Sequence, residues 1–322
     1  MKIINASDNF QKATWLDTDF PTLIVDNFID NQEGEKLTRD GKIFIKSEAK
    51  NNTVVHGGRI LIPFSSDKFK RLTKISKSWN NFYKIFKVRS LKLFLKELDN
   101  VKNLSEISKT SIDELKLISL KDTEEYKLLN KLNLKLLEKK YNNLLEKKIG
   151  SIPPSKLFSI STIRLFDSYW RKFKSLIQYL LGEKPILPLF DYSFSSNGYG
   201  REIHRDSDNR LIVVLLYLNN LGESTSGGDL EIYKLKKSRI KQNLYPPQPK
   251  KNDCELQYVI KPKRGRLIMF INQYNSYHAV SEMINDEEGR HFLYGGFTYP
   301  SSLFVNSKRL SRSKLKTEMF LY

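Results

Sequence analysis

A histidine and a carboxylate stand two residues apart where a polar segment leads into a strongly apolar one. His204 and Asp206 lie in Gly198-Tyr-Gly-Arg-Glu-Ile-His204-Arg-Asp206, and the apolar run follows from Arg210 onward. Side chains two residues apart in an extended chain point to the same side. An imidazole and a carboxylate aimed at one point suit a divalent transition metal, and one further histidine would complete a face of two histidines and one carboxylate.

His278 is the histidine that we expect to complete this face. It lies on a predicted strand that follows an apolar segment and a polar turn. In a jelly roll, such an arrangement returns the chain to the neighbouring strand across the barrel mouth. The chain has four histidines in all, of which we assign His56 to an ordinary loop position: His56, His204, His278 and His291.

A basic residue stands on a later strand of the same region. Arg290, Phe292 and Tyr294 share one face of this predicted strand, whereas His291 and Leu293 share the other. An arginine buried in an otherwise apolar barrel must be paired, and its fork fits a carboxylate. Since the adjoining predicted strands offer no obvious acidic partner, a bound dicarboxylate is an attractive counter-charge.

Short apolar segments with turn signals between them indicate a sandwich or jelly roll. The predicted strands are Pro21–Phe28, Leu189–Phe194, Arg210–Leu218, Gly227–Tyr233, Gln257–Ile260, Gly265–Ile271, Tyr277–Ser281 and His291–Thr298. A helix with Asp30 or Asn31 as its N-cap is expected after the first of them. The predicted apolar lining of the barrel is Ile212, Val214, Leu216, Ile268 and Phe270.

Residues 65–149 contain neither glycine nor proline and are rich in leucine, lysine and glutamate, which predicts helices. We interpret the aromatic group Trp79, Phe82, Tyr83 and Phe86 as core. We predict an α+β chain in four parts: an N-terminal α+β segment packing on the core (1–63), a Lys/Leu-rich helical region (64–150), a jelly-roll, cupin-like core with a leading helix (151–300) and a basic tail (301–322).

The composition limits the function classes. The formal net charge of +19 is compatible with nucleic-acid binding, but we favour a compositional origin, because lysine and asparagine are abundant throughout. One cysteine, Cys254, excludes a disulfide framework and a cysteine-based zinc site. The N-terminus lacks a signal-peptide pattern, and no stretch reaches the roughly 18 apolar residues of a membrane span. We therefore expect a cytoplasmic protein without a membrane partner.

The motifs together resemble the iron(II)/2-oxoglutarate dioxygenases, in their prolyl 4-hydroxylase-like branch. The resemblance covers residues 187–300 and implies a double-stranded β-helix with N-terminal and inserted helices. It rests on segments that stand in the family's order: His204-Arg-Asp206, Leu216-Tyr-Leu-Asn219, Gly227-Gly-Asp-Leu230, Ile260-Lys-Pro262, Gly265-Arg-Leu-Ile-Met-Phe270, His278-Ala-Val280 and Gly289-Arg290.

The resemblance implies iron ligation by His204, Asp206 and His278, with no catalytic residue beyond these ligands. It implies that Arg290 binds the C5 carboxylate of 2-oxoglutarate. His291 is the alternative, because the family often places its basic residue two positions after the glycine. Tyr192 is the candidate for a hydrogen bond to the co-substrate, with Tyr199 as the alternative.

The implied reaction is hydroxylation of a C–H bond, with Fe(II) as cofactor, 2-oxoglutarate and O2 as co-substrates, and ascorbate as a candidate reductant. Succinate and CO2 would be released. The primary substrate is a protein, a peptide or a small molecule, and peptidyl proline is one candidate. Two alternatives stay open. One is oxidation of a nucleic-acid or nucleotide base, motivated by the charge, the 234–251 loop and the tail. The other is a catalytically inactive jelly-roll binding protein.

Overall fold

Two antiparallel β-sheets and three α-helices make up the regular structure of the computed structural model, which describes residues 13–49, 54–55, 58–98, 187–206, 210–236, 248–272 and 275–298. The larger sheet has the order β1-β2-β10-β7-β12-β5-β4-β3, and the smaller has the order β6-β11-β8-β9. The strands of the larger sheet are Thr14–Leu16 (β1), Thr22–Val25 (β2), Val54–Val55 (β3), Arg59–Pro63 (β4), Leu187–Ser195 (β5), Arg210–Tyr217 (β7), Leu267–Ile271 (β10) and Arg290–Thr298 (β12). Those of the smaller sheet are Arg201–His204 (β6), Leu230–Leu235 (β8), Cys254–Ile260 (β9) and Tyr277–Val280 (β11). The helices are Asn31–Ser47 (α1), Asp67–Ile75 (α2) and Lys77–Leu98 (α3), and a 3-10 turn, Lys251–Asp253, precedes β9.

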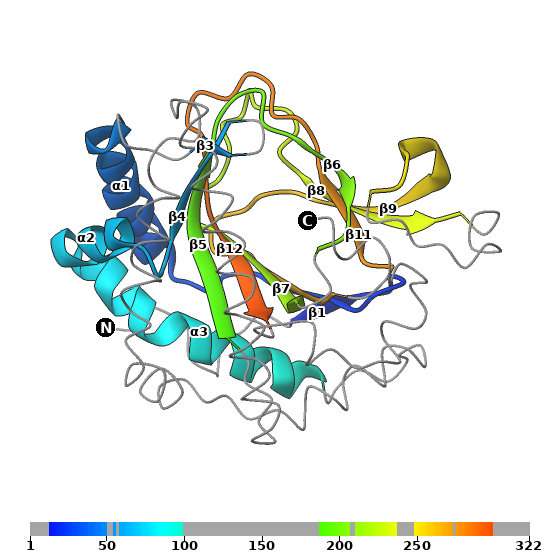
Figure 1. Ribbon diagram of the computed structural model, residues 1–322, viewed down its shortest axis with the longest axis horizontal. Helices are drawn as coiled ribbons and strands as arrows, with labels where there is room; N and C mark the ends of the chain where they lie inside the picture. The colour runs from blue at the N-terminus through cyan, green and yellow to red at the C-terminus, as the bar shows by residue number, and fades with distance from the viewer. Residues whose placement is uncertain are drawn as a thin grey trace, which may run out of the picture.

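The two sheets curve around a shared interior, with β5, β12 and β7 on one side and β6, β11 and β8 on the other (Figure 1). One apolar cluster fills part of this interior and takes residues from both sheets. Its buried members are Phe20, Val213, Leu215, Tyr217, Leu230, Ile232, Ile260, Ile268, Phe270 and Phe292. Burial of these side chains between the sheets holds the two layers face to face.

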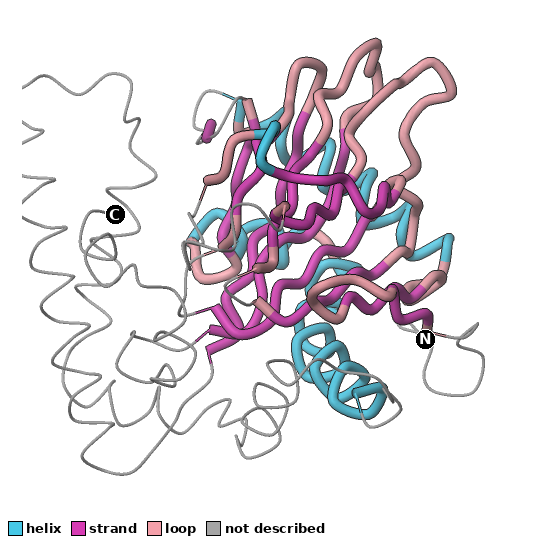
Figure 2. The backbone as a smooth tube through the Cα atoms, turned by 90° about the vertical axis from the view of Figure 1, so that its right-hand side faces the viewer, coloured by secondary structure: helices cyan, strands magenta, loops and turns pink. Residues whose placement is uncertain are grey.

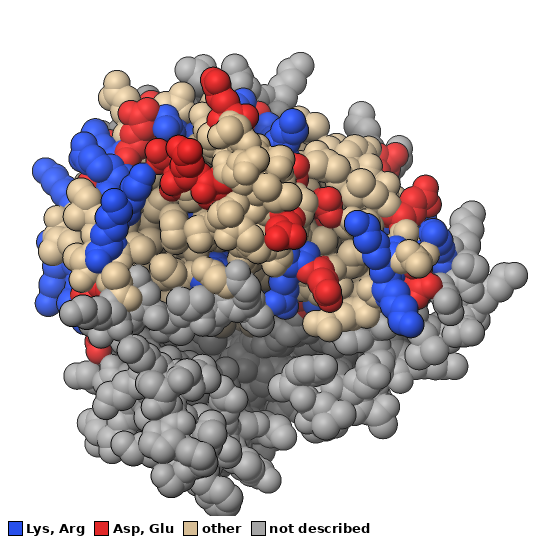
Figure 3. All heavy atoms as spheres, turned by 90° about the horizontal axis from the view of Figure 1, so that it is seen from above, with Lys and Arg blue, Asp and Glu red and all other residues tan. Residues whose placement is uncertain are grey.

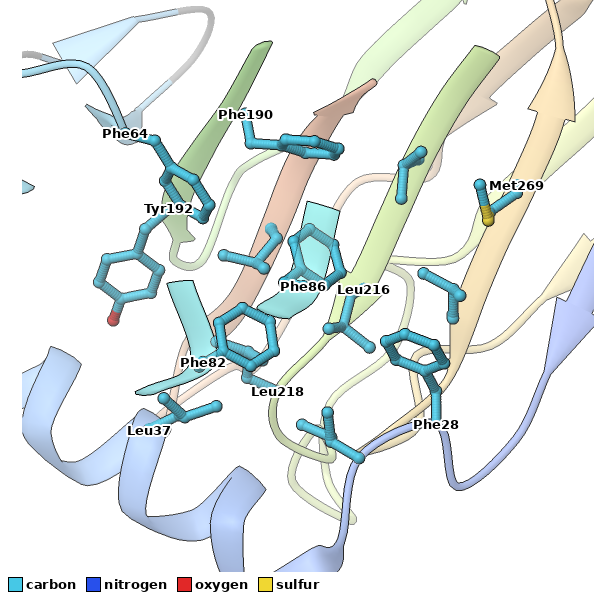
Figure 4. Close-up of a cluster of buried hydrophobic side chains, with 14 of the residues drawn as sticks. Phe28, Leu37, Phe64, Phe82, Phe86, Phe190, Tyr192, Leu216, Leu218 and Met269 are labelled. Atoms are coloured by element: carbon cyan, nitrogen blue, oxygen red, sulfur yellow. The ribbon is translucent and has the colours of Figure 1, made fainter. Parts of the chain in front are cut away.

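The helices cover the outer face of the larger sheet. In Figure 2 the strands occupy the middle of the described chain, and a helix runs along their outer side. Asp30 caps α1 by accepting hydrogen bonds from the backbone N–H groups of Gln32 and Glu33, as predicted. The helices contribute Trp79, Phe82 and Phe86, all fully buried, to a second cluster with β5, β7 and β10 (Figure 4). The predicted core role of these three rings is confirmed.

The predicted lining of the interior is wrong for β7. Val213, Leu215 and Tyr217 face the interior, whereas the residues that we predicted there, Ile212, Val214 and Leu216, face the helices. Because β7 is apolar on both faces, its sequence holds no alternation that would decide which side chains point inward. The predicted interior positions of Ile268 and Phe270 are confirmed.

The predicted fold class is confirmed at the level of a mixed chain with helices and antiparallel sheets. All seven strands that we predicted beyond residue 186 occur, with small shifts at their ends. The N-terminal strands join the same sheet, since β2 pairs with β10 and β4 pairs with β5. The predicted helices beyond residue 98, the leading helix, His56 and the basic tail lie outside the described residues.

A glycine pair before β8 makes a close contact with the loop after β11. Gly227 has a φ of 76°, and a Cβ atom on it would lie 1.8 Å from the carbonyl oxygen of Glu282. Gly228 has a φ of 74°, and its N–H donates to the carbonyl oxygen of Ser281. Only glycine combines this backbone conformation with such an approach.

Gly227→Ala should therefore destabilise the protein by about 3 kcal/mol or more, because left-handed strain and a backbone clash add together. Gly198→Ala is the matched control: Gly198 has a φ of 81° but has nothing within 4 Å of the added methyl group. We expect it to cost only about 1 kcal/mol. Urea denaturation measures both values, and equal losses would contradict the contact with Glu282.

Candidate metal centre

Antiparallel pairing brings the two histidines of the predicted triad together. His204 is the last residue of β6, and His278 is its direct partner on β11. Asp206 follows two residues after the end of β6, before β7 begins. One potential ligand atom from each of the three residues lies within 4.8 Å of the others. The structure thus brings together all three residues that we predicted as ligands.

Each histidine has one ring nitrogen engaged and the other available. Nδ1 of His204 lies 2.8 Å from the carbonyl oxygen of Glu202, and Nδ1 of His278 lies 3.0 Å from that of Ser276. A carbonyl oxygen only accepts, so Nδ1 carries the proton and Nε2 keeps its lone pair. Nε2 of His278 is buried and has no hydrogen-bond partner among the described residues. This donor set fits a divalent transition metal.

The protonation states also fit metal ligation. Burial, together with the nearby His278, lowers the pKa of His204 to about 3, and burial lowers that of His278. Burial acts to raise the pKa of Asp206, but the Arg210 guanidinium and the two imidazoles outweigh it and bring the value to about 2. Two neutral imidazoles and one ionised carboxylate are the forms that bind a metal ion at neutral pH.

Two residues of the larger sheet fix the Asp206 carboxylate. The Tyr294 hydroxyl lies 2.8 and 3.0 Å from its two oxygens, and Arg210 donates from Nη1 at 3.3 Å. The guanidinium of Arg210 also lies 5.0 Å from the Tyr294 ring centroid. Sequence reasoning missed both roles, although the alternation of Tyr294 with Arg290 placed it on the inner face.

Arg290 is buried in the interior with few partners. It is 1% exposed, its Nη1 donates to the carbonyl oxygen of Gly228 at 2.5 Å, and its Nε has no hydrogen-bond partner among the described residues. Its guanidinium carbon lies 4.6, 5.2 and 5.9 Å from the ring centroids of Phe292, Tyr199 and Tyr217. No ion pair joins it to a carboxylate within the described part of the chain. Burial lowers its pKa, and the interactions with Tyr217, Tyr199 and Asp229 do not offset this effect.

Tyr217 is a further interior group that sequence reasoning missed. Its hydroxyl is buried and has no hydrogen-bond partner in the described chain, and burial raises its pKa to about 12. The phenol is therefore a neutral donor close to Arg290. The only sequence signal is a polar atom within the otherwise apolar Leu216-Tyr-Leu218 segment.

Tyr192 and His291 lie on the opposite face of the sheet, which corrects the prediction for Tyr192. The Tyr192 hydroxyl and Nδ1 of His291 share a hydrogen bond of 2.7 Å, and the Tyr192 ring packs against Trp79. Figure 4 shows Tyr192 among the side chains beneath the helices. Alternation along β5 and β12 turns both side chains away from the metal-ligand group. The alternative, Tyr199, lies beside Arg290 instead.

Asp208, which we interpreted as solvated, lies outside the described residues. No helix in the described ranges is long and apolar enough to cross a membrane.

Mutation of His278 should remove metal binding. We expect the wild-type chain to bind one Fe(II) or Co(II) ion, and His278→Ala to weaken binding on the order of 100-fold or more, because a direct ligand is lost. Anaerobic isothermal titration measures both affinities. His291→Ala is the control, since it removes a buried histidine outside the group. Equal losses in the two variants would contradict the assigned ligand set.

His291 should make stability depend on pH. Burial, with the nearby Lys42 charge, lowers its folded-state pKa from 6.5 to about 4. The unfolded chain thus takes up a proton at a higher pH than the folded chain does, and stability falls as pH drops from about 6.5 to about 4. The contribution is about 3 kcal/mol at most. In urea denaturation, His291→Gln should show a smaller fall over this range, and an unchanged slope would contradict the burial of a neutral imidazole.

Comparison with known proteins adds an independent finding. Residues 190–295 match the family model described as the 2OG-Fe(II) oxygenase superfamily. A search of curated proteins finds no match. Similar solved structures include a Pseudomonas putida prolyl-4-hydroxylase, with 12% identity over 86% of this chain and 92% of that chain and a TM-score of 0.39. A Trichoplax adhaerens prolyl hydroxylase, in complex with a hypoxia inducible factor oxygen degradation domain peptide fragment, has 12% identity over 92% of this chain and 87% of that chain, also with a TM-score of 0.39.

The matched segment contains His204, Asp206, His278 and Arg290. The family implies Fe(II) as the metal, with 2-oxoglutarate and O2 as co-substrates. Over residues 190–295 the chain is similar to the 2OG-Fe(II) oxygenase superfamily, and this match supports an oxidoreductase of the dioxygenase type.

Proposed function

We propose that this chain hydroxylates a C–H bond of a primary substrate in a reaction that needs Fe(II) and 2-oxoglutarate and releases succinate and CO2. One observation carries the proposal: His204, Asp206 and His278 converge with their ligand atoms within 4.8 Å of one another. Three protein ligands on one face leave further coordination positions open, which is the arrangement of non-haem iron oxygenases. Bound Fe(II) would supply the redox chemistry that activates O2.

The surroundings of the centre orient the ligands. The carbonyl oxygens of Glu202 and Ser276 hold the two imidazoles with Nε2 available. Tyr294 and Arg210 hold the Asp206 carboxylate in its ionised form. Hydrogen bonds of this kind fix ligand orientation and raise metal affinity.

Arg290 is the residue that we propose for the C5 carboxylate of 2-oxoglutarate. It is a buried cation without a carboxylate partner among the described residues, and its fork would bind a carboxylate through two parallel hydrogen bonds. The Tyr217 hydroxyl is the second donor available near it, and the Tyr199 ring flanks the guanidinium. The apolar interior formed by Val213, Leu215 and Phe270 limits the access of water to the centre.

We propose the double-stranded β-helix as the fold, because the two sheets face one another and the metal ligands lie where β6 and β11 meet the interior. Its core would include β2 and β4 from the N-terminal 63 residues as well as the strands beyond residue 186. This proposal keeps the predicted boundaries of the helical region at 64–150 and of the basic tail at 301–322, with α2 and α3 of the helical region packed on the larger sheet.

The alternatives receive no specific support from the described residues. On the face that Figure 3 shows, basic and acidic side chains are interspersed and form no continuous basic stripe. Ascorbate as reductant and peptidyl proline as substrate stay predictions. An inactive binding protein would not need a converging ligand set with two available Nε2 atoms.

Turnover of 2-oxoglutarate tests the proposal. The Fe(II)-loaded chain should form succinate, and His204→Ala should abolish this while the protein stays folded. Arg290→Gln should raise the KM for 2-oxoglutarate roughly 10–100-fold, as expected for the loss of a charge-assisted interaction. Succinate is quantified by mass spectrometry, and circular dichroism reports the fold.

The control for Arg290 is its neighbour. His291→Ala should leave the KM for 2-oxoglutarate unchanged, because its side chain faces the helices. If His291→Ala raises the KM and Arg290→Gln does not, then His291, and not Arg290, binds the C5 carboxylate of 2-oxoglutarate. A folded wild-type protein that takes up no iron and forms no succinate would remove the enzyme proposal altogether.

A further inference from the structure

A second arginine lies in the interior beside the metal-ligand group. Arg59, the first residue of β4, is 8% exposed. Its guanidinium carbon lies 5.1 Å from the Tyr294 ring centroid and 5.9 Å from that of Phe292. Since the Tyr294 hydroxyl is hydrogen bonded to Asp206, a single side chain separates Arg59 from a metal ligand. The role proposed for Arg290 leaves this cation without a function.

The inner face of β5 is polar next to Arg59. Asp191 and Ser193 stand opposite Tyr294 and Phe292 in the pairing of β5 with β12, and Ser193 is fully buried. The Ser193 hydroxyl donates to Oδ1 of Asp191 at 2.5 Å. Burial raises the pKa of Asp191, whereas the positive charge of Arg59 acts to lower it. A buried polar row on an otherwise apolar strand is costly unless it binds something.

The ion pair between Arg59 and Asp191 contains no direct hydrogen bond, and we call it the open pair. Nη2 of Arg59 lies 4.0 Å from Oδ1 of Asp191, too far for a hydrogen bond, and Nε of Arg59 has no hydrogen-bond partner among the described residues. Arg266 and Asp26 form a closed pair in the same chain, with two contacts of 2.7 and 3.0 Å.

The open pair is also the more deeply buried one. The side chains of Arg59 and Asp191 are 10% and 16% exposed, against 19% and 26% for Arg266 and Asp26. A buried pair that serves stability alone needs close geometry to offset its desolvation. The Arg59–Asp191 pair has burial without that geometry, as expected of charges arranged for a ligand.

We propose that Arg59 and Asp191 bind the carboxylate and ammonium groups of a free α-amino acid, the primary substrate of the dioxygenase. This inference rests on the proposed function and names its substrate class. The guanidinium fork would bind the carboxylate, and the aspartate would accept from the ammonium group. An α-amino acid carries its ammonium and carboxylate groups on the same carbon atom, which suits a guanidinium nitrogen and a carboxylate oxygen that lie 4.0 Å apart.

Other substrate classes fit these two residues less well. A purely anionic substrate would be repelled by the negative charge of Asp191, and a purely cationic one would be repelled by the positive charge of Arg59. A residue within a peptide chain has a neutral backbone, which would bring no charged group to either member of the Arg59–Asp191 pair. A zwitterion satisfies both residues at once.

The reaction balances without another reactant. One oxygen atom of O2 enters a C–H bond of the amino acid, and the other enters succinate. The amino acid and 2-oxoglutarate each lose two electrons, O2 gains four, and CO2 leaves.

A substrate screen tests the inference directly. The Fe(II)-loaded full chain is incubated with 2-oxoglutarate, O2 and each proteinogenic L-amino acid, and products are examined for the mass of one added oxygen. We expect at least one free amino acid to be hydroxylated, with kcat/KM at least roughly 10–100-fold lower for its N-acetyl and its amide derivatives.

Failure of the inference differs from failure of the proposed function. Consumption of 2-oxoglutarate without oxygen entering any amino acid, or equal turnover of the free and capped forms, overturns the inference alone. A protein that neither binds Fe(II) nor consumes 2-oxoglutarate under any condition overturns the proposed function.

Variants of the pair separate substrate binding from a structural role. With the amino acid so identified, Arg59→Lys and Asp191→Asn should each raise its KM roughly 10–100-fold and leave the KM for 2-oxoglutarate within about 2-fold. Arg71→Gln is the matched control, because Arg71 lies on α2 and forms an ion pair with Glu48 at the surface. The amino acid should raise the Tm of the wild-type and control proteins but not of Asp191→Asn. Lower Tm values in both pair variants with an unchanged KM for the amino acid would show a structural pair and overturn the inference.

Discussion

The pairing of β6 with β11 is the interaction on which the centre depends. It sets His204 opposite His278, and each ring bonds through Nδ1 to the carbonyl oxygen two residues earlier in the chain. The same local geometry thus orients both imidazoles without a carboxylate partner. Asp206 is then held from the other sheet by Tyr294 of β12 and Arg210 of β7. The ligand set exists only where the two sheets face each other.

Charge burial distinguishes the structural from the functional groups of this interior. Arg266 and Asp26 neutralise each other through two short contacts at the start of β10 and the end of β2. Arg290 and Arg59 are buried more deeply but have no comparable partner among the described residues. The free energy needed to hold such cations away from water is recovered when an anion binds, so stability and ligand affinity are coupled at these positions.

The outer face of the larger sheet serves a different purpose. Trp79, Phe82 and Phe86 of α3 bury the apolar face of β5 and β7, and Tyr192 and His291 close a hydrogen bond beneath them. A Cβ atom on Gly41 of α1 would meet the Tyr192 ring, so the helix approaches the sheet closely. This packing covers the outer faces of β5 and β12, whose inner faces carry Asp191, Arg290 and Tyr294.

The sequence by itself predicted the three candidate metal ligands, seven of the eight strands beyond residue 186 and the buried arginine of β12. Residue type and a spacing of two carry that information, because a strand always turns alternate side chains to one side. Only the tertiary structure determined which side chains of β7 face the interior. It also determined that Tyr192 faces the helices and that Arg59 lies near Asp191. A strand that is apolar on both faces has no alternation of polar and apolar residues that would show which side chains point inward. Arg59 and Asp191 lie far apart in the chain. Their contact arises from the pairing of β4 with β5, which no local pattern encodes.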